Sequence, residues 1–173
     1  RNIEVYEARF QASQSDWNDA KVSLAAQVAD VYVSYRECEV LLATYQEESK
    51  SRNETKSITD LRVKAGFSAL TDGKQATASL YQNTSNLENQ IGVCNQYKNQ
   101  LVALTGITHE TLDKELKLNA GKIPLPQNTT INKIPADILS QRPDVSSAER
   151  SLAAANAQIG VATANRYPSI SLT

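Results

Sequence analysis

Apolar side chains recur at every seventh position along the first part of the chain, which is the spacing of a coiled-coil seam. No proline or glycine occurs before Gly66, so the pattern predicts one unbroken helix from about Ile3 to Lys64. A strict repeat of this kind implies packing against a partner helix. Between Gln46 and Ser57 the seam becomes polar, which should loosen the packing there. The seven-residue set is Ile3, Phe10, Trp17, Leu24, Val31, Cys38 and Tyr45, and a second set, Val28, Tyr35, Leu42 and Val63, joins it.

The stretch around Gly66 is the one interruption between two long helical patterns, and it predicts a hairpin tip at residues 66 to 70. Gly66 can adopt the left-handed conformation that ends a helix. Ser68 or Thr71 can cap the next helix, with Asp72 in its positively polarised first turn. Because the second helix starts within a few residues of the end of the first, the two must fold back on each other.

A second run of seven-residue spacing predicts a returning helix that Gly106 ends. It covers about 35 residues, or roughly 50 Å, whereas the first helix is roughly 90 Å long. A third helix of about 24 residues, from Pro143 to Arg166, adds roughly 35 Å, so these two helices could stack end to end along the first. The seam of the second helix is Leu80, Leu87, Cys94 and Leu101, and the expected contact face of the third is Val145, Ala148, Leu152, Ala155, Ile159 and Ala162.

The sequence thus predicts an all-α fold, a long antiparallel coiled-coil hairpin with a second stacked helix and a loop-rich equatorial segment. The hairpin takes residues 1–106 and the upper helix takes 143–166. Between them, residues 107–142 form a proline-rich equatorial waist with a short helical turn near Thr108 to Leu116. Residues 167–173 alternate apolar and polar side chains and predict the start of a β-strand.

Cys38 and Cys94 are predicted to face one another across the hairpin. Both lie on the seven-residue seam, and Gly66 lies midway between them in sequence. Residues equidistant from the tip of an antiparallel hairpin lie opposite each other. The two cysteines could form either a disulfide or a pair of buried thiols. A Cα separation well beyond about 7 Å would exclude the disulfide.

Composition and charge exclude several function classes. The net charge of −1 carries no sign of nucleic-acid binding. Aromatic residues make up only 6%, which suits extended helices better than a thick core. No apolar run reaches the length of a membrane-spanning helix, and no signal peptide opens the chain. Because the chain lacks Met and begins within a helical pattern, we expect it to be a piece of a larger protein.

Motifs for catalysis or metal binding are not apparent in the sequence. His109 begins the run His-Glu-Thr-Leu-Asp, one residue short of the zinc pattern HExxH, and the chain has no second histidine. Neither a phosphate-binding loop nor a nucleophile elbow occurs. We therefore expect no enzyme activity, no metal and no cofactor.

Three motifs, in order along the chain, resemble the TolC family of outer-membrane efflux channels, in its multidrug and metal-efflux lipoprotein branch. The first is the tip, Arg62-x-x-x-Gly66-Phe67-x-x-Leu70-Thr71-Asp72. The second is Ile134-Pro135-Ala136-Asp137-Ile138-Leu139-Ser140-Gln141-Arg142-Pro143-Asp144-Val145. The third is the ending, Ala162-x-Ala164-x-Arg166-Tyr167-Pro168-Ser169-Ile170-Ser171-Leu172-Thr173. The resemblance covers essentially all 173 residues.

The resemblance implies a homotrimer in the outer membrane of a Gram-negative bacterium. Members of the family combine a membrane-embedded β-barrel with an α-helical barrel that forms a tunnel through the periplasm. This chain resembles the periplasmic helical part of the first of two repeats. The second repeat, nearly all transmembrane β-strands and any lipid-bearing cysteine are absent from it. The periplasm is oxidising, which permits a disulfide.

The resemblance also gives the tip a function. Family members work in tripartite efflux systems with an inner-membrane transporter and a periplasmic adaptor protein, whose helical hairpins meet the channel tips. The adaptor contact would fall on Arg62, Gly66, Phe67, Ser68 and Leu70, and a periplasmic gate on Thr71 and Asp72. The purely structural alternative is that Gly66 only ends a helix and Asp72 only complements a helix dipole.

Export through a passive duct is therefore the favoured function, and two alternatives remain. A periplasmic adaptor (membrane-fusion) hairpin would be flanked by β-segments rich in Gly and Val, which do not occur here. A structural coiled-coil bundle would not need the proline-rich waist or the terminal strand. The exported substrate cannot be read from the sequence.

Overall fold

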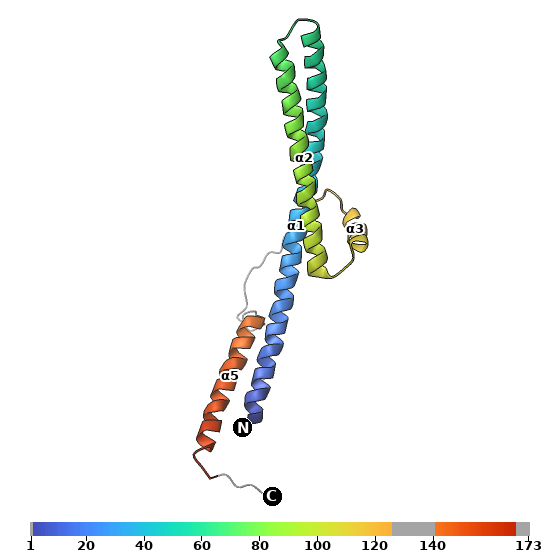
Figure 1. Ribbon diagram of the computed structural model, residues 1–173. Coiled ribbons are helices and arrows are strands. Elements are labelled where there is room, and N and C mark those ends of the chain that lie inside the picture. Colours follow the sequence, from blue (N-terminus) through green and yellow to red (C-terminus); the bar gives the residue numbers. More distant parts are fainter. Residues whose placement is uncertain (1, 126–140, 169–173) are drawn as a thin grey trace, which may run out of the picture. The chain divides into compact units, whose positions relative to one another are not determined.

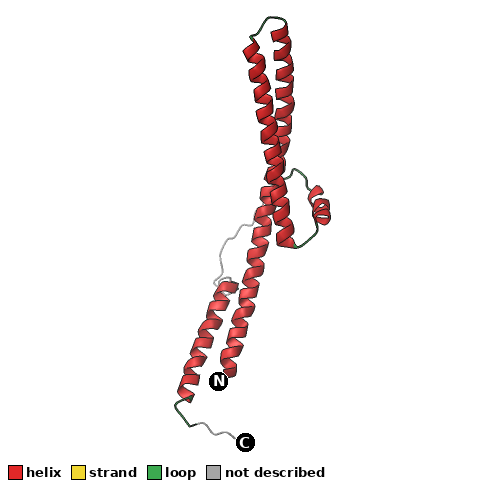
Figure 2. Cartoon of the chain, viewed as in Figure 1, coloured by secondary structure: helices red, strands yellow, loops and turns green. Residues whose placement is uncertain are grey.

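The computed structural model describes residues 2–125 and 141–168. Its helices are α1 (Asn2–Lys64), α2 (Leu70–Thr105), α3 (His109–Lys117) and α5 (Pro143–Ala164), as labelled in Figure 1. No strand occurs among the described residues, which are helices joined by loops and turns (Figure 2). The predicted all-α fold class is confirmed. Most of the second motif and the predicted strand beyond Pro168 lie outside the described residues.

The lengths of the helices follow from where glycine and capping residues occur. α1 runs unbroken for 63 residues, as the absence of proline and glycine before Gly66 predicts. Gly106, at a φ of 70°, ends α2, and its amide donates to the carbonyl of Val102 over 2.8 Å. Thr108 caps α3 by accepting a hydrogen bond from the Thr111 amide. None of the described helices combines the length and apolar character needed to cross a bilayer.

The chain forms two compact units, to both of which α1 contributes. Unit 1 consists of Arg1–Ala26 and Gln127–Thr173, and unit 2 of Gln27–Pro126. The hairpin tip, both cysteines and α3 belong to unit 2.

Unit 2 has an apolar core where α1, α2 and α3 meet. Cys38 of α1 and Cys94 of α2 are joined by a disulfide, with their Cα atoms 5.7 Å apart. Leu112 and Leu116 bring one face of α3 onto the core, and α2 and α3 are in contact. The buried members of this core are Tyr35, Cys38, Cys94, Leu101, Leu112 and Leu116.

In unit 1, α5 packs against the beginning of α1 through small side chains. On α1 the buried residues are Val5, Ala8 and Ala12, and on α5 the buried residue is Ala154. Polar contacts hold the two helices beside this seam. Ser15 and Ser146 share a hydrogen bond of 3.0 Å, Ser147 donates to Asp16 over 2.5 Å, and Arg150 donates to Gln11 over 3.2 Å.

This packing corrects the sequence interpretation of unit 1, because the largest apolar side chains do not lie in the seam. Residues predicted as the first part of the α1 seam are exposed, with Phe10 at 70% and Trp17 at 65%. On α5, Leu152 and Ile159 from the predicted contact face are exposed as well. Small side chains allow two helices to approach closely, and α5 packs on the face of α1 that carries Ala8 and Ala12. The exposed large apolar residues described in unit 1 are Ile3, Tyr6, Phe10, Trp17, Val22, Leu24, Leu152, Ile159 and Tyr167.

Candidate functional site

The tip of the hairpin is a helix-ending motif built on Gly66. Gly66 has a φ of 77°, in the left-handed region that glycine adopts without strain. Its amide donates to the carbonyl of Val63 over 3.0 Å, and the amide of Phe67 donates to that of Arg62 over 2.8 Å. These two bonds make a Schellman motif, which satisfies the last carbonyl groups of α1. Backbone hydrogen bonds therefore fix the conformation of the turn.

The returning helix is capped differently from the prediction. Ala69, and neither Ser68 nor Thr71, is the N-cap residue of α2. Asp72 compensates for the missing polar cap, because its carboxylate accepts a hydrogen bond from the Ala69 amide over 3.2 Å. The Asp72 amide in turn donates to the Ala69 carbonyl over 3.0 Å. Asp72 thus has a structural role in the first turn of α2.

The residues predicted for the adaptor contact and the gate lie together at the tip, and most of them are exposed. Phe67 is 83% exposed and Leu70 is 68% exposed, although both are apolar. Arg62, Thr71 and Asp72 are exposed as well, and Ser68 is partly buried. Phe67 and Leu70 therefore form a small exposed apolar surface on a well-defined turn.

Behind the tip, the two helices approach closely at Gly73. This residue is buried, and a Cβ atom there would lie 3.4 Å from the Asp60 carboxylate and 3.5 Å from the Val63 side chain. Sequence reasoning did not identify Gly73, because a glycine within a helical pattern indicates close packing only when the facing helix is known.

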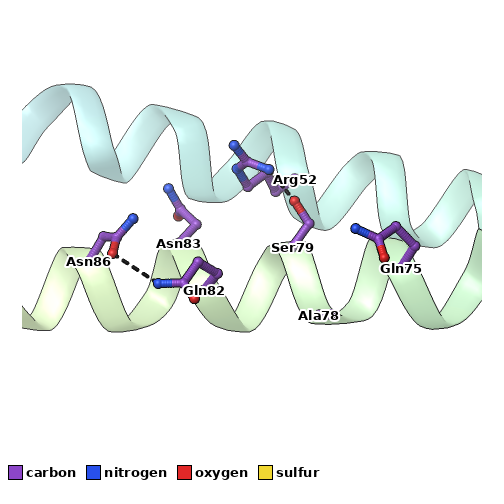
Figure 3. Close-up of a pocket in the computed structure, with 7 residues that line it drawn as sticks. All are labelled: Arg52, Gln75, Ala78, Ser79, Gln82, Asn83 and Asn86. Atoms are coloured by element: carbon purple, nitrogen blue, oxygen red, sulfur yellow. Dashed lines mark hydrogen bonds between the residues drawn. The ribbon is translucent and has the colours of Figure 1, made fainter.

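Farther from the tip, the seam between α1 and α2 is polar, as expected, and opens into a groove. The groove has a volume of about 390 Å³ and is lined by the side chains drawn in Figure 3. Arg52 of α1 contacts Ser79 of α2 and pairs with Glu48 over 2.5 Å. Asn83 lies at the base of the groove and is only 2% exposed. Its amide group has no hydrogen-bonding partner among the described residues.

Between this groove and the waist, a buried arginine connects α1 to α3. Arg36 is 0% exposed. It donates from Nη1 to Glu39 over 2.6 Å and from Nη2 to the carbonyl of Leu116 over 2.8 Å. Its guanidinium also lies over the ring of Tyr32, 4.9 Å from the centroid. Nothing in the sequence pattern indicated Arg36, because its main partner is a main-chain atom 80 residues away.

Arg36, Glu39 and Tyr35 form a cluster in which the Glu39 carboxylate is partly buried and paired with the Arg36 guanidinium. Burial alone would raise the pKa of Glu39, but hydrogen bonds from Arg36 and the Gly121 amide outweigh it and lower that pKa. Burial, and after it the Glu39 carboxylate, raises the pKa of Tyr35 well above its usual value. The cluster is suited to holding α3 in place. Within the described residues, no group of three or more His, Cys, Asp or Glu side chains could hold a metal ion.

Comparisons with known proteins agree with this architecture. Residues 1–108 match the family described as "Outer membrane efflux protein". The chain is 31% identical over 173 residues to nodulation protein T of Rhizobium leguminosarum bv. viciae, covering 100% of this chain and 36% of the relative. It is 32% identical over 174 residues to the toluene efflux pump outer membrane protein TtgC of Pseudomonas putida, covering 99% of this chain and 34% of the relative.

Among solved structures, the fold is similar to that of the outer-membrane channel OprN. The TM-score is 0.82 at 26% sequence identity, over 95% of this chain and 36% of that one. VceC of Vibrio cholerae shares the fold, with a TM-score of 0.77 at 21% identity, over 95% of this chain and 38% of that one. The chain therefore spans about a third of the length of these relatives. Because the match extends over more than half of its residues, the chain belongs to the outer membrane efflux protein family, that of the TolC-like channels.

Proposed function

We propose that this chain is the periplasmic tunnel segment of a trimeric outer-membrane export duct in a tripartite efflux system. In this proposal its tip docks a periplasmic adaptor protein, which links the duct to an inner-membrane transporter. The full-length protein would lie in the outer membrane of a Gram-negative bacterium, with this part in the periplasm. Its relatives include outer membrane proteins of efflux pumps, which supports the proposal for the whole protein.

The observation that carries the docking proposal is the pair of exposed apolar side chains on the tip. Phe67 and Leu70 lie on a turn that the backbone hydrogen bonds of Gly66 and Phe67 to the end of α1 hold in place. The Cys38–Cys94 disulfide and the close approach at Gly73 further limit how far the two helices of the hairpin can slide. A preorganised surface of this kind loses little conformational entropy when a partner binds.

The exposed apolar residues of unit 1 support the proposed homotrimer. Ile3, Phe10 and Trp17 recur at seven-residue spacing and are exposed in the single chain. Seven-residue spacing is the pattern that a neighbouring helix covers. Large apolar patches that remain exposed in one chain mark contact surfaces.

We also propose that Asp72, with Thr71, helps to close the periplasmic end of the tunnel. Threefold symmetry would bring three copies of the Asp72 carboxylate around one axis, where like charges repel and each needs a cationic partner. No ion pair among the described residues of this chain includes Asp72. A partner would therefore come from a neighbouring hairpin of the trimer.

Site-specific photocrosslinking in living cells tests the docking proposal. The full-length channel would carry p-benzoylphenylalanine in place of Phe67, and the channel and its adaptor would be produced together. We expect a channel–adaptor product that mass spectrometry maps to the helical hairpin of the adaptor. The same probe at Ser85, which is exposed on α2 away from the tip, is the matched control. The proposal would be contradicted if the probe at residue 67 gave no adaptor crosslink, or gave no more of it than the probe at residue 85.

A further inference from the structure

We propose that the groove beside Asn83 receives an Asn or Gln side chain from a helix of the full-length channel that lies outside this sequence. The inference rests on the proposed assembly of the whole protein and adds a specific contact to it. In this contact, the incoming carboxamide pairs with the carboxamide of Asn83 through both its donor and its acceptor.

The unsatisfied amide of Asn83 is the first observation. Its Oδ1 and Nδ2 atoms are both buried and have no hydrogen-bonding partner among the described residues. Burying a carboxamide without partners costs free energy, so such groups are normally paired in the functional state. A carboxamide that offers one donor and one acceptor side by side is complementary to a second carboxamide.

The lining of the groove is the second observation. The side chains around Asn83 are carboxamides, one hydroxyl and the methyl group of Ala78, and the one charged side chain, Arg52, is matched by Glu48. A charged ligand would find no free opposite charge there, and an apolar ligand would meet a lining that is more polar than apolar. The groove therefore selects a neutral, hydrogen-bonding partner. The lining residues are Arg52, Gln75, Ala78, Ser79, Gln82, Asn83 and Asn86.

The shape of the groove indicates a helix. Gln75, Ser79, Gln82 and Asn86 recur at intervals of three and four residues, which places them in one stripe along α2. The neighbouring hollow shares Arg52, Gln75 and Ser79 with this groove and extends to Asp72. Together they span 15 residues of α2, from Asp72 to Asn86, or roughly 20 Å. An elongated hollow between two helices suits a third helix that lies along them.

The partner is assigned to the same protein because the relatives of this chain are about three times as long as the chain. The chain spans only 36% of nodulation protein T and 34% of TtgC, so a full-length protein of similar length would have further segments that could supply such a helix. Figure 3 shows the Asn83 side chain directed from α2 towards α1, with Gln82 and Arg52 beside it. These neighbours are long and flexible, so changes of rotamer can open a path to the amide. A single polar residue in a helical seam is a known means of setting register.

Photocrosslinking in the full-length channel tests this proposal. With p-benzoylphenylalanine in place of Gln82, we expect a crosslink to a helical peptide of the channel itself that contains Asn or Gln. A crosslink from residue 82 to another protein, or none, would overturn the proposal. The probe at Phe67 in the same cells reports on adaptor docking separately, so the proposed function can stand when this inference fails.

A substitution provides the second measurement. Asn83→Leu in the full-length channel should lower the temperature at which the trimer dissociates in detergent by about 5 °C. Asn99→Leu adds the same side chain at an exposed position of α2 outside the groove and should leave that temperature unchanged. If Asn83 is only an unsatisfied core residue, the leucine will raise the dissociation temperature or leave it unchanged. Either result would overturn the proposal.

Discussion

The Nη2 atom of Arg36 lies 2.8 Å from the main-chain carbonyl oxygen of Leu116. A buried side chain of α1 therefore donates a hydrogen bond to a carbonyl group in the last turn of α3. The same guanidinium pairs with Glu39, whose carboxylate also accepts from the Gly121 amide over 3.1 Å. Two charged residues of α1 therefore hold both ends of the turn that follows α3. The position of α3 depends on these contacts as well as on Leu112 and Leu116.

Replacing Arg36 by methionine tests this role. The substitution leaves the Glu39 carboxylate and the Leu116 carbonyl without their partner, which should cost about 2 kcal/mol. Amide hydrogens of α3 should then exchange roughly 30-fold faster, because local opening is favoured by that amount. Lys98→Met, which removes the more exposed Lys98–Asp113 pair, is the control and should have a much smaller effect. Equal exchange in the two variants would contradict the assignment.

The Glu39 carboxylate should also make the stability of unit 2 depend on pH. Its pKa is lowered in the folded state, so its contribution is present above the pKa of the unfolded chain, about 4.3. That contribution is lost as the pH falls through the folded-state pKa. Chemical unfolding at a series of pH values should therefore show a steeper acid loss for the wild type than for Glu39→Gln. Parallel pH profiles would show that Glu39 contributes nothing through its charge.

Removing the disulfide should destabilise the hairpin. The two cysteines are separated by 56 positions, and closing a loop of that size stabilises the folded state by about 4 kcal/mol in the chain-entropy account. The variant with Cys38→Ser and Cys94→Ser should lose about this much free energy of unfolding, measured by urea denaturation and circular dichroism. A reductant should reproduce the loss in the wild type and have no effect on the variant. A loss below about 1 kcal/mol would contradict the prediction.

The gate proposal for Asp72 requires its structural role to be separated from its charge. Asp72→Asn retains an oxygen that can accept from the Ala69 amide, whereas Asp72→Ala removes it. If the charge closes the tip, both variants should raise the ion conductance of the full-length channel in a lipid bilayer. An increase with alanine alone would assign the effect to the helix cap. Unchanged conductance in both variants, at normal trimer yield, would remove Asp72 from the gate.

The long helix, its turn and the returning helix could be predicted because each depends on local signals. Continuous helix formers lead up to Gly66, and glycines with positive φ end both arms of the hairpin. Antiparallel geometry placed Cys38 opposite Cys94 by counting alone. The predicted capping residue was wrong, because Asp72 stabilises the beginning of α2 from the third position of the helix and an alanine suffices at the N-cap.

Other features could not be predicted because they depend on contacts between distant parts of the chain. The seven-residue repeat identified Phe10 and Trp17 as apolar seam residues but could not say which partner covers them. In this chain α5 packs on the small side chains of α1 instead, and the large ones remain exposed. In the sequence, Arg36 and Asn83 cannot be told from ordinary exposed polar residues of a helix, because only the structure shows that both are buried.

The central claim is that the full-length protein is an export duct that works through its tip. The most direct measurement is the accumulation of a pump substrate in cells that lack their own outer-membrane channel but contain the cognate pump and adaptor. Wild-type channel should lower the accumulation, and Phe67→Asp should fail to lower it at an equal amount of trimer. Phe67→Leu, which keeps an apolar side chain, should act like the wild type. Equal accumulation with and without the wild-type channel would contradict the account.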